Sequence, residues 1–161
     1  MAYIDTMTGL GNRTAFLEEN KSNAFFPGMI SYIIMDANNL KTINDTLGHN
    51  KGDELIITIA KCMRKAVGHN GQCYRIGGDE FVIILKNKTA AETEEIINKV
   101  RCEIEFADKQ SDITISVAIG YVWTDTEQKN LEDLMQHADD EMYQDKKKTK
   151  ENKSKENTHS I

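Results

Sequence analysis

Apolar and polar positions alternate along the chain between strand-like and helix-like periods. An almost unbroken apolar run at 29–36 predicts a central strand that is buried on both faces. Apolar side chains at helical spacing predict an amphipathic helix over 50–67 and a last helix that begins near 131. Thr89 and Glu92 form a capping-box pair ahead of a further helix. Segments of both kinds are typical of a domain that packs helices on a sheet.

A hairpin and one more strand complete the expected elements. Two short β-rich runs, 72–76 and 81–85, flank a glycine-containing turn and predict the hairpin. Alternation over 112–123 predicts the further strand. The order is then helix, strand, helix, hairpin, helix, strand and helix. We therefore expect one α/β (α+β) sandwich domain, with a mixed central sheet flanked by helices.

Composition places the chain among globular proteins. Its 161 residues suffice for one domain, and 39% hydrophobic with 29% charged residues argue against wholesale disorder. No apolar run approaches the roughly 20 residues of a membrane span, and no signal peptide opens the chain. The three cysteines form no CxxC pair and indicate reduced thiols, at Cys62, Cys73 and Cys102. We expect a cytoplasmic domain, compatible with membrane anchoring of a longer protein.

The charge distribution bears on partners and on the domain boundary. A net charge of −6 is unfavourable for binding a nucleic-acid backbone, so no nucleic-acid partner is expected. Lysines gather near the C-terminus, and after Lys150 the chain is polar without apolar periodicity. This predicts a folded domain over 1–150 and a disordered basic tail over 151–161. Such a tail could also contact an acidic membrane surface.

Three acidic residues fall where strands are predicted to end. Asp36 closes the central strand, where ligand sites of open α/β sheets collect, and Asp79 and Glu80 lie in the hairpin turn. Acidic residues that converge from adjacent strands offer oxygen ligands to a hard cation such as Mg²⁺. Glycine and aspartate also fill ordinary turns. From spacing alone, a plain turn is the simpler interpretation.

Several collinear blocks change that interpretation, because together they resemble the GGDEF family, the diguanylate cyclase domain. Its members condense two GTP molecules into cyclic di-GMP. The resemblance covers about 5–150 and implies a largely antiparallel sheet in a nucleotidyl-cyclase/polymerase-palm-like fold. The blocks are GGDEF itself at 77–81, DxLTGLxNR at 5–13, DxDxFKxIND at 36–45, GHxxGD at 48–53, a late strand motif beginning at Ser116, and ADxALYxAK at 138–146.

The chain departs from the family pattern at a few positions. Asn38 replaces the second aspartate of DxD, and Leu40 replaces the aromatic residue that follows it. Asp145 stands where alanine usually precedes the lysine of the last block, and Lys150 matches an arginine. None of these changes removes a carboxylate to which the resemblance assigns catalysis.

The resemblance implies a metal site and two catalytic residues. Asp36, the backbone carbonyl of Ala37 and Asp79 would hold Mg²⁺ (or Mn²⁺). Asp79 and Glu80 are the expected catalytic residues, with Glu80 supporting activation of the attacking 3′-hydroxyl. The alternative for Glu80 is a surface carboxylate in a turn.

The resemblance also implies how GTP is held. Guanine presents two adjacent donors that the carboxylate of Asp53 can accept, while the amide of Asn44 can serve the acceptors of the same base. Asp53 could instead cap a helix. Lysines near a helix C-terminus could instead stabilise that helix by interacting with its macrodipole. The positions that match triphosphate contacts are Lys41, Lys146 and Lys150.

Partners and regulation follow from the same resemblance. One domain holds one GTP, so a second protomer is required, and we expect an N-terminal sensory domain in the full-length protein to bring the two together. The alternative function is a catalytically weak or inactive GTP-binding module with a regulatory or interaction role. Many family members carry an inhibitory RxxD motif that binds the product. Its arginine and aspartate positions are Gly68 and Gly71 here, so no tight product inhibition is expected.

Overall fold

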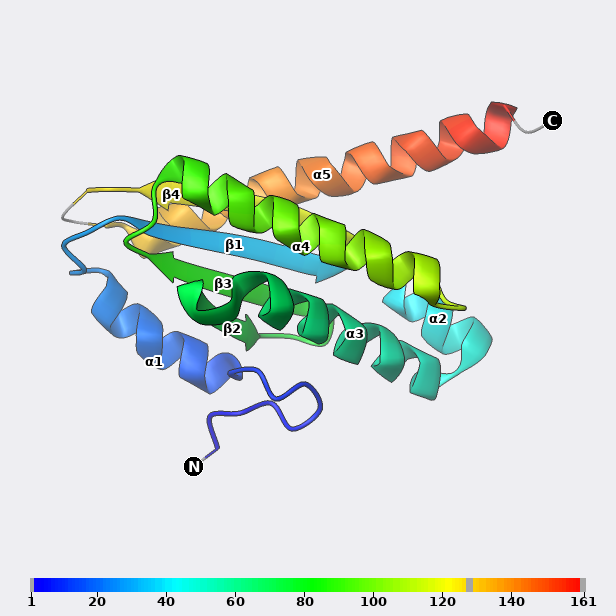
Figure 1. Cartoon of the computed structure of the whole chain (residues 1–161), viewed down its shortest axis with the longest axis horizontal. Coiled ribbons are helices and arrows are strands. Elements are labelled where there is room, and N and C mark those ends of the chain that lie inside the picture. The colour runs from blue at the N-terminus through cyan, green and yellow to red at the C-terminus, as the bar shows by residue number, and fades with distance from the viewer. Residues whose placement is uncertain (1, 127–128, 160–161) are drawn as a thin grey trace.

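A four-stranded sheet forms the centre of the computed structural model, which describes residues 2–126 and 129–159, with side chains up to Lys150 (Figure 1). The strand order is β2-β3-β1-β4, and all three neighbouring pairs are antiparallel. The four-stranded sheet is therefore antiparallel, where a mixed sheet was expected. Within the described residues, the parallel pairing is an isolated bridge between Gly11 and Tyr74. The strands are β1 (Ile30–Ala37), β2 (Gly71–Arg75), β3 (Glu80–Lys86) and β4 (Val117–Thr124).

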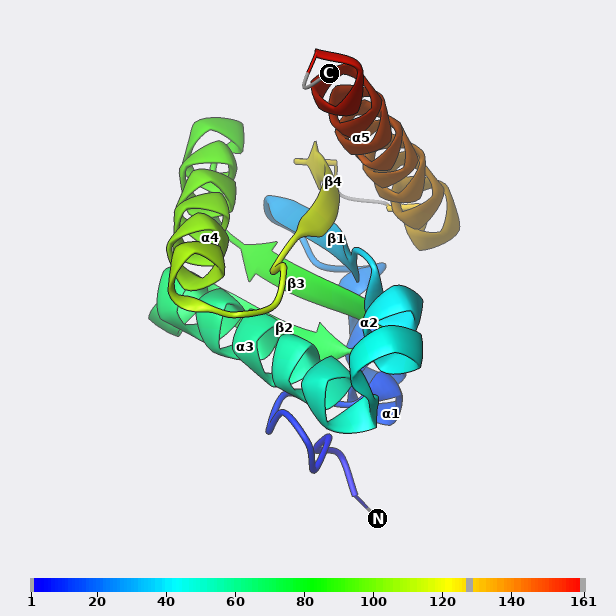
Figure 2. The same ribbon diagram turned by 90° about the vertical axis from the view of Figure 1, so that its right-hand side faces the viewer.

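Helices cover both faces of the sheet, as the side view in Figure 2 shows. Ile33 and Met35 of β1 belong to the larger core cluster, with residues of α3 and α4, whereas Tyr32 and Ile34 belong to a second cluster with residues of α1 and α5. Burial on both faces explains the unbroken apolar run, and the α+β sandwich is confirmed. These helices are α1 (Arg13–Asn23), α3 (His49–Val67), α4 (Ala90–Gln110) and α5 (Leu131–His159).

The predicted helix between the first strand and the hairpin is preceded by another helix, α2 (Leu40–Leu47). Gly48 separates α2 from α3 with φ +92°, a left-handed conformation that disfavours L side chains. The sequence did not predict α2 because its first turn follows Asn39, which makes no side-chain cap. The capping box of Thr89 and Glu92 is confirmed, with both reciprocal hydrogen bonds at 3.1 Å.

The last two elements begin and end differently from the prediction. Strand β4 starts at Val117, because the preceding N–H groups donate to side chains instead of a neighbouring strand. Ile113 N–H donates to Ser111 Oγ (3.1 Å), and Ile115 N–H donates to Asp108 Oδ1 (2.8 Å). Helix α5 continues to His159, whereas composition predicted a disordered tail after Lys150. Lysine and glutamate, which are frequent there, have high helix propensity. Among the described residues, no helix has the length and apolar character needed to cross a membrane.

Candidate active site

Strand β1 and the β2–β3 hairpin bring four of the predicted site residues to one end of the sheet. Asp36 lies opposite Glu80 in the register of β1 and β3. The N–H of Ala37 donates to the backbone carbonyl of Asp79 at 2.8 Å. The hairpin is therefore the neighbour of the central strand, and Asp36, Ala37, Asp79 and Glu80 are adjacent although the chain separates them by more than forty positions.

The carboxylate of Asp36 is the most constrained charge at this end of the sheet. Its side chain is 13% exposed, and its Oδ2 accepts from the ammonium of Lys146 at 2.7 Å. Its Oδ1 is buried and has no hydrogen-bond partner within the described part of the chain. Burial raises the pKa of Asp36, Lys146 opposes this rise, and the nearby charge of Asp79 adds to it. A buried, unpartnered carboxylate oxygen next to a second carboxylate favours a cation.

The donor set fits a hard divalent cation that shares its ligands with a substrate. Two carboxylates and a backbone carbonyl are the oxygen ligands that Mg²⁺ takes from proteins, with phosphates and water completing the shell. No group of three or more His, Cys, Asp or Glu side chains forms a metal cluster among the described residues. A cation bound here would therefore take only some of its ligands from side chains.

Arg75 fixes the turn that carries Asp79, a role that the sequence analysis missed. Its guanidinium donates to the carbonyl of Gly78 through Nη2 (2.8 Å) and Nε (3.2 Å). The same guanidinium pairs with Asp5 at 3.3 Å. Although burial acts to raise it, hydrogen bonds from Thr8 and the charge of Arg75 lower the pKa of Asp5. The N-terminal segment is thus tied to the signature turn through one arginine. A basic residue two positions before the turn was the only signal for it.

The predicted guanine-binding residues lie at the corner where α2 meets α3. Asn44 is on α2, and its Oδ1 would lie 1.8 Å from a Cβ built on Gly52 of α3. Only glycine leaves room for the amide in this position. Asp53, half-buried, follows Gly52 along α3. Because the N-cap of α3 is Gly48, Asp53 lies one turn inside the helix, and the alternative that it caps the helix is wrong.

The three predicted triphosphate lysines come from two helices. Lys41 is exposed in the first turn of α2, which starts three positions after Ala37. Lys146 pairs with Asp36, and Lys150 is exposed one turn further along α5. Since α5 ends at His159, Lys146 lies far from the helix C-terminus, where the macrodipole acts. The macrodipole therefore does not account for Lys146.

Comparison with known proteins adds sequence and fold relatives. The family described as "Diguanylate cyclase, GGDEF domain" matches residues 2–152. The diguanylate cyclase DgcN of Escherichia coli K12 is 33% identical over 152 residues, which are 90% of this chain and 37% of the relative. The cyclic di-GMP phosphodiesterase PdeB of Shewanella oneidensis is 28% identical, over 86% of this chain and 16% of the relative. The chain thus spans less than two fifths of the length of these curated relatives.

A solved structure has the same fold. The GGDEF domain of DgcB from Caulobacter crescentus, solved in complex with cyclic di-GMP, superimposes with a TM-score of 0.80 at 25% identity and covers 91% of each chain. The family match extends over nearly the whole sequence, and it includes the end of the sheet where Asp36 and Asp79 meet. The chain belongs to the family of diguanylate cyclase GGDEF domains.

Proposed function

We propose that this chain is a diguanylate cyclase domain that condenses two GTP molecules into cyclic di-GMP and releases two pyrophosphates. In each half-reaction the 3′-hydroxyl oxygen of one GTP bonds to the α-phosphorus of the other. The bond from that phosphorus to the bridging oxygen breaks, and pyrophosphate leaves. The observation that carries the proposal is Asp36, buried beside Asp79 with one carboxylate oxygen unpartnered and the other on Lys146.

Asp36, Asp79 and the carbonyl of Ala37 are the residues that would hold Mg²⁺ or Mn²⁺. When bound, the ion neutralises phosphate charge and makes the hydroxyl a better nucleophile. Glu80, which is exposed beside Asp79, would support activation of the 3′-hydroxyl by accepting the proton that it loses. Lys146 balances the charge of Asp36 in the nucleotide-free site and can turn to the triphosphate, where Lys41 and Lys150 add positive charge.

Guanine is proposed to bind at the corner of α2 and α3. The carboxylate of Asp53 would accept from N1–H and N2–H₂ of the base, and the amide of Asn44 would donate to its acceptors. Gly52 supports this arrangement, because any side chain there would push Asn44 aside. Adenine lacks the donor pair, so the corner favours GTP over ATP.

Because each domain holds one GTP, product formation requires two protomers with their sites facing each other. In a longer protein, an N-terminal sensory domain would provide this pairing. For the chain alone we expect specific activity that rises with protein concentration. The measurement is chromatography of products from GTP and Mg²⁺ over a dilution series, with sedimentation to establish the oligomeric state. Activity independent of concentration where the chain is monomeric would contradict the requirement for two protomers. Absence of product at every concentration would favour the inactive GTP-binding module.

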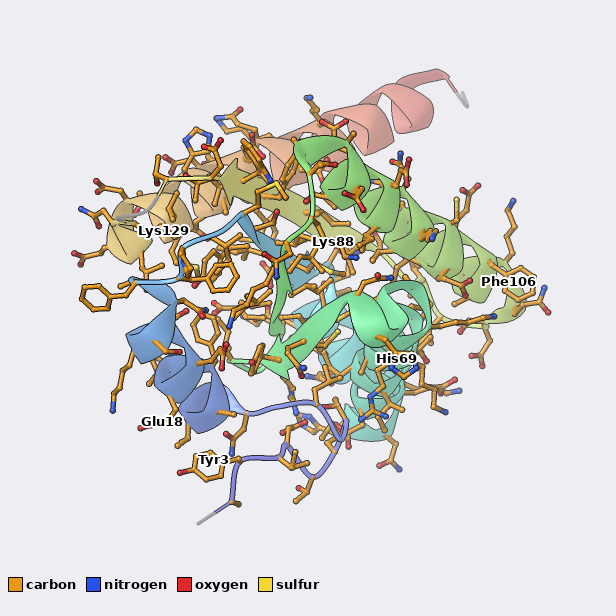
Figure 3. The ribbon with its side chains drawn as sticks, turned by 60° about the vertical axis from the view of Figure 1, so that its left-hand side comes forward. Tyr3, Glu18, His69, Lys88, Phe106 and Lys129 are labelled. Atoms are coloured by element: carbon orange, nitrogen blue, oxygen red, sulfur yellow. The ribbon has the colours of Figure 1, made fainter. Side chains whose placement is uncertain are left out.

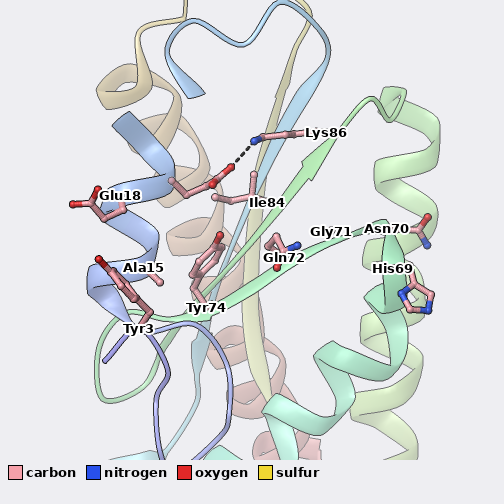
Figure 4. Close-up of a pocket in the computed structure, with 11 residues that line it drawn as sticks. Tyr3, Ala15, Glu18, His69, Asn70, Gly71, Gln72, Tyr74, Ile84 and Lys86 are labelled. Atoms are coloured by element: carbon pink, nitrogen blue, oxygen red, sulfur yellow. Dashed lines mark hydrogen bonds and ion pairs between the residues drawn. The ribbon is translucent and has the colours of Figure 1, made fainter. Parts of the chain in front are cut away.

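The family's inhibitory site is replaced by glycines for backbone reasons. Gly68 has φ +54°, and a Cβ on Gly71 would lie 2.5 Å from the carbonyl oxygen of Ile84. A pocket of about 710 Å³ lies alongside, with Tyr3 and Glu18 on one side and His69 on the other (Figures 3 and 4). Its lining contains no arginine within the described residues, and its lysine, Lys86, is paired with Glu19. The described lining of this pocket therefore offers no guanidinium to grip phosphate, and the nearby Arg64 donates to the carbonyl of Thr8 at 3.0 Å.

We accordingly expect no submicromolar binding of cyclic di-GMP outside the active site. Calorimetry in the absence of GTP measures this, with the double variant Asp53→Ala/Asp79→Ala to remove binding in the active site. Tight binding that persists in the double variant would show that this side of β2 is an inhibitory site after all.

A further inference from the structure

Helix α5 covers the free edge of the sheet with two carboxylates. Strand β4 is at the edge of the sheet, so alternate N–H groups face away from β1. The N–H of Ile119 donates to Asp145 Oδ2 at 2.8 Å, and the N–H of Tyr121 donates to Glu141 Oε2 at 3.0 Å. The two carboxylates take the place of a neighbouring strand.

The spacing of these bonds sets the register of α5 on β4. Glu141 and Asp145 are four positions apart on a helix, a rise of about 6 Å. Ile119 and Tyr121 are two positions apart on a strand, about 6.6 Å. The repeats match, so both bonds form together only in this register. Gly120, between the two donors, lets the helix come close, because a Cβ there would lie 2.1 Å from the carbonyl oxygen of Ala138.

Asp145 is the part of this contact nearest to the active site. It directly precedes Lys146, whose Nζ lies 2.7 Å from Asp36 Oδ2. Arg101 of α4 approaches the same Asp145 Oδ2 at 3.6 Å from the other side of the sheet. Asp145 is therefore held between the edge of β4 and a guanidinium. The alanine that the family pattern has at this position could make neither contact.

We propose that Asp145 is a positioning residue that holds Lys146 at Asp36 by fixing α5 on the edge of β4. Without its carboxylate, the turn of α5 that carries Lys146 loses its bond to Ile119, and the ammonium is no longer kept on the carboxylate of Asp36. The consequence for GTP binding rests on the proposed cyclase function. The placement of Lys146 does not, so the two can be tested separately.

The test measures the reactivity of Lys146 in the nucleotide-free chain. Brief acetylation with an N-hydroxysuccinimide ester, read by peptide mass spectrometry, gives its rate relative to exposed Lys99 of α4. We expect Asp145→Ala to raise the relative rate about fivefold, the effect of losing one hydrogen bond. Asp145→Asn keeps an oxygen that can accept from Ile119, and it should restore the wild-type rate.

Glu141→Ala is the matched control, because it removes the same kind of bond one turn away from Lys146. It should lower the unfolding temperature as Asp145→Ala does but leave the reactivity of Lys146 near wild type. Equal reactivity of Lys146 in both alanine variants, or no change in Asp145→Ala, would overturn the proposal.

A kinetic measurement separates this inference from the proposed function. If the chain is a cyclase, Asp145→Ala should raise KM for GTP about fivefold with little change in kcat, because Lys146 binds the triphosphate before and during the reaction. A fall in kcat at unchanged KM would contradict positioning of Lys146. If the wild-type chain makes no product, the proposed function fails, and the acetylation rates still decide the role of Asp145.

Discussion

We expect the replacement of Asp79 by asparagine to abolish the cyclic di-GMP formation proposed for this chain, with a loss of about three orders of magnitude or more. Asparagine keeps the size of the side chain and removes its negative charge. The site then has Asp36 alone, already paired with Lys146, and cannot balance a divalent cation. Chromatography of the products from GTP and Mg²⁺ measures the loss. Asp36→Asn should have the same effect from the neighbouring strand.

The stability of the Asp79→Asn variant provides the control. The direction in which its unfolding temperature changes follows from the pKa of Asp36. Burial, together with the charge of Asp79, holds this pKa above the unfolded value. A carboxyl group with a raised pKa stabilises the fold below the unfolded pKa, and this contribution is lost as the pH rises through the folded pKa. At neutral pH without metal the two ionised carboxylates therefore cost stability. The variant should unfold at the same or a slightly higher temperature than wild type. Near wild-type activity in this folded variant would rule out the two-carboxylate site.

The sequence predicted those parts of the fold that depend on local pattern. The apolar run of β1 and the capping box of Thr89 are readable from neighbouring residues, and both are confirmed. The start of β4 was predicted five residues early, because Ser111 and Asp108 intercept the N–H groups of the preceding segment. Such side-chain acceptors give no periodic signal in the sequence. Strand boundaries that depend on them can therefore be recognised only in the structure.

In the candidate site, too, some residues could be predicted from local pattern and others could not. The ends of predicted strands placed Asp36 and Asp79 together, because a hairpin next to the central strand requires it. The pairing of Asp36 with Lys146 joins positions 110 apart, and no pattern along the chain indicates it. Arg75 and Asp145 were visible only as a lone basic residue and a departure from a motif. Their contacts depend on tertiary register, which local spacing does not encode.

We expect the second large effect at the proposed guanine site, the corner of α2 and α3 that carries Asn44 and Asp53. Asp53→Ser replaces a carboxylate that would accept two hydrogen bonds from guanine with a hydroxyl that can also donate. We expect the preference for GTP over ATP, measured as a ratio of kcat/KM values, to fall by about a hundredfold or more. Both nucleotides would be supplied singly and in competition, and the products separated by chromatography.

Glu54→Ser is the matched control for this change. Glu54 is the next residue of α3, and its exposed carboxylate pairs with Lys51 at 3.1 Å. Serine in its place removes a charge from the same helix turn and should leave the preference for GTP unchanged. Neither substitution removes the N-cap of α3, which is Gly48, so both variants should keep the fold. A preference that survives Asp53→Ser would mean that guanine is recognised elsewhere. An equal loss in both variants would trace the effect to the charge of the helix and not to Asp53 in particular.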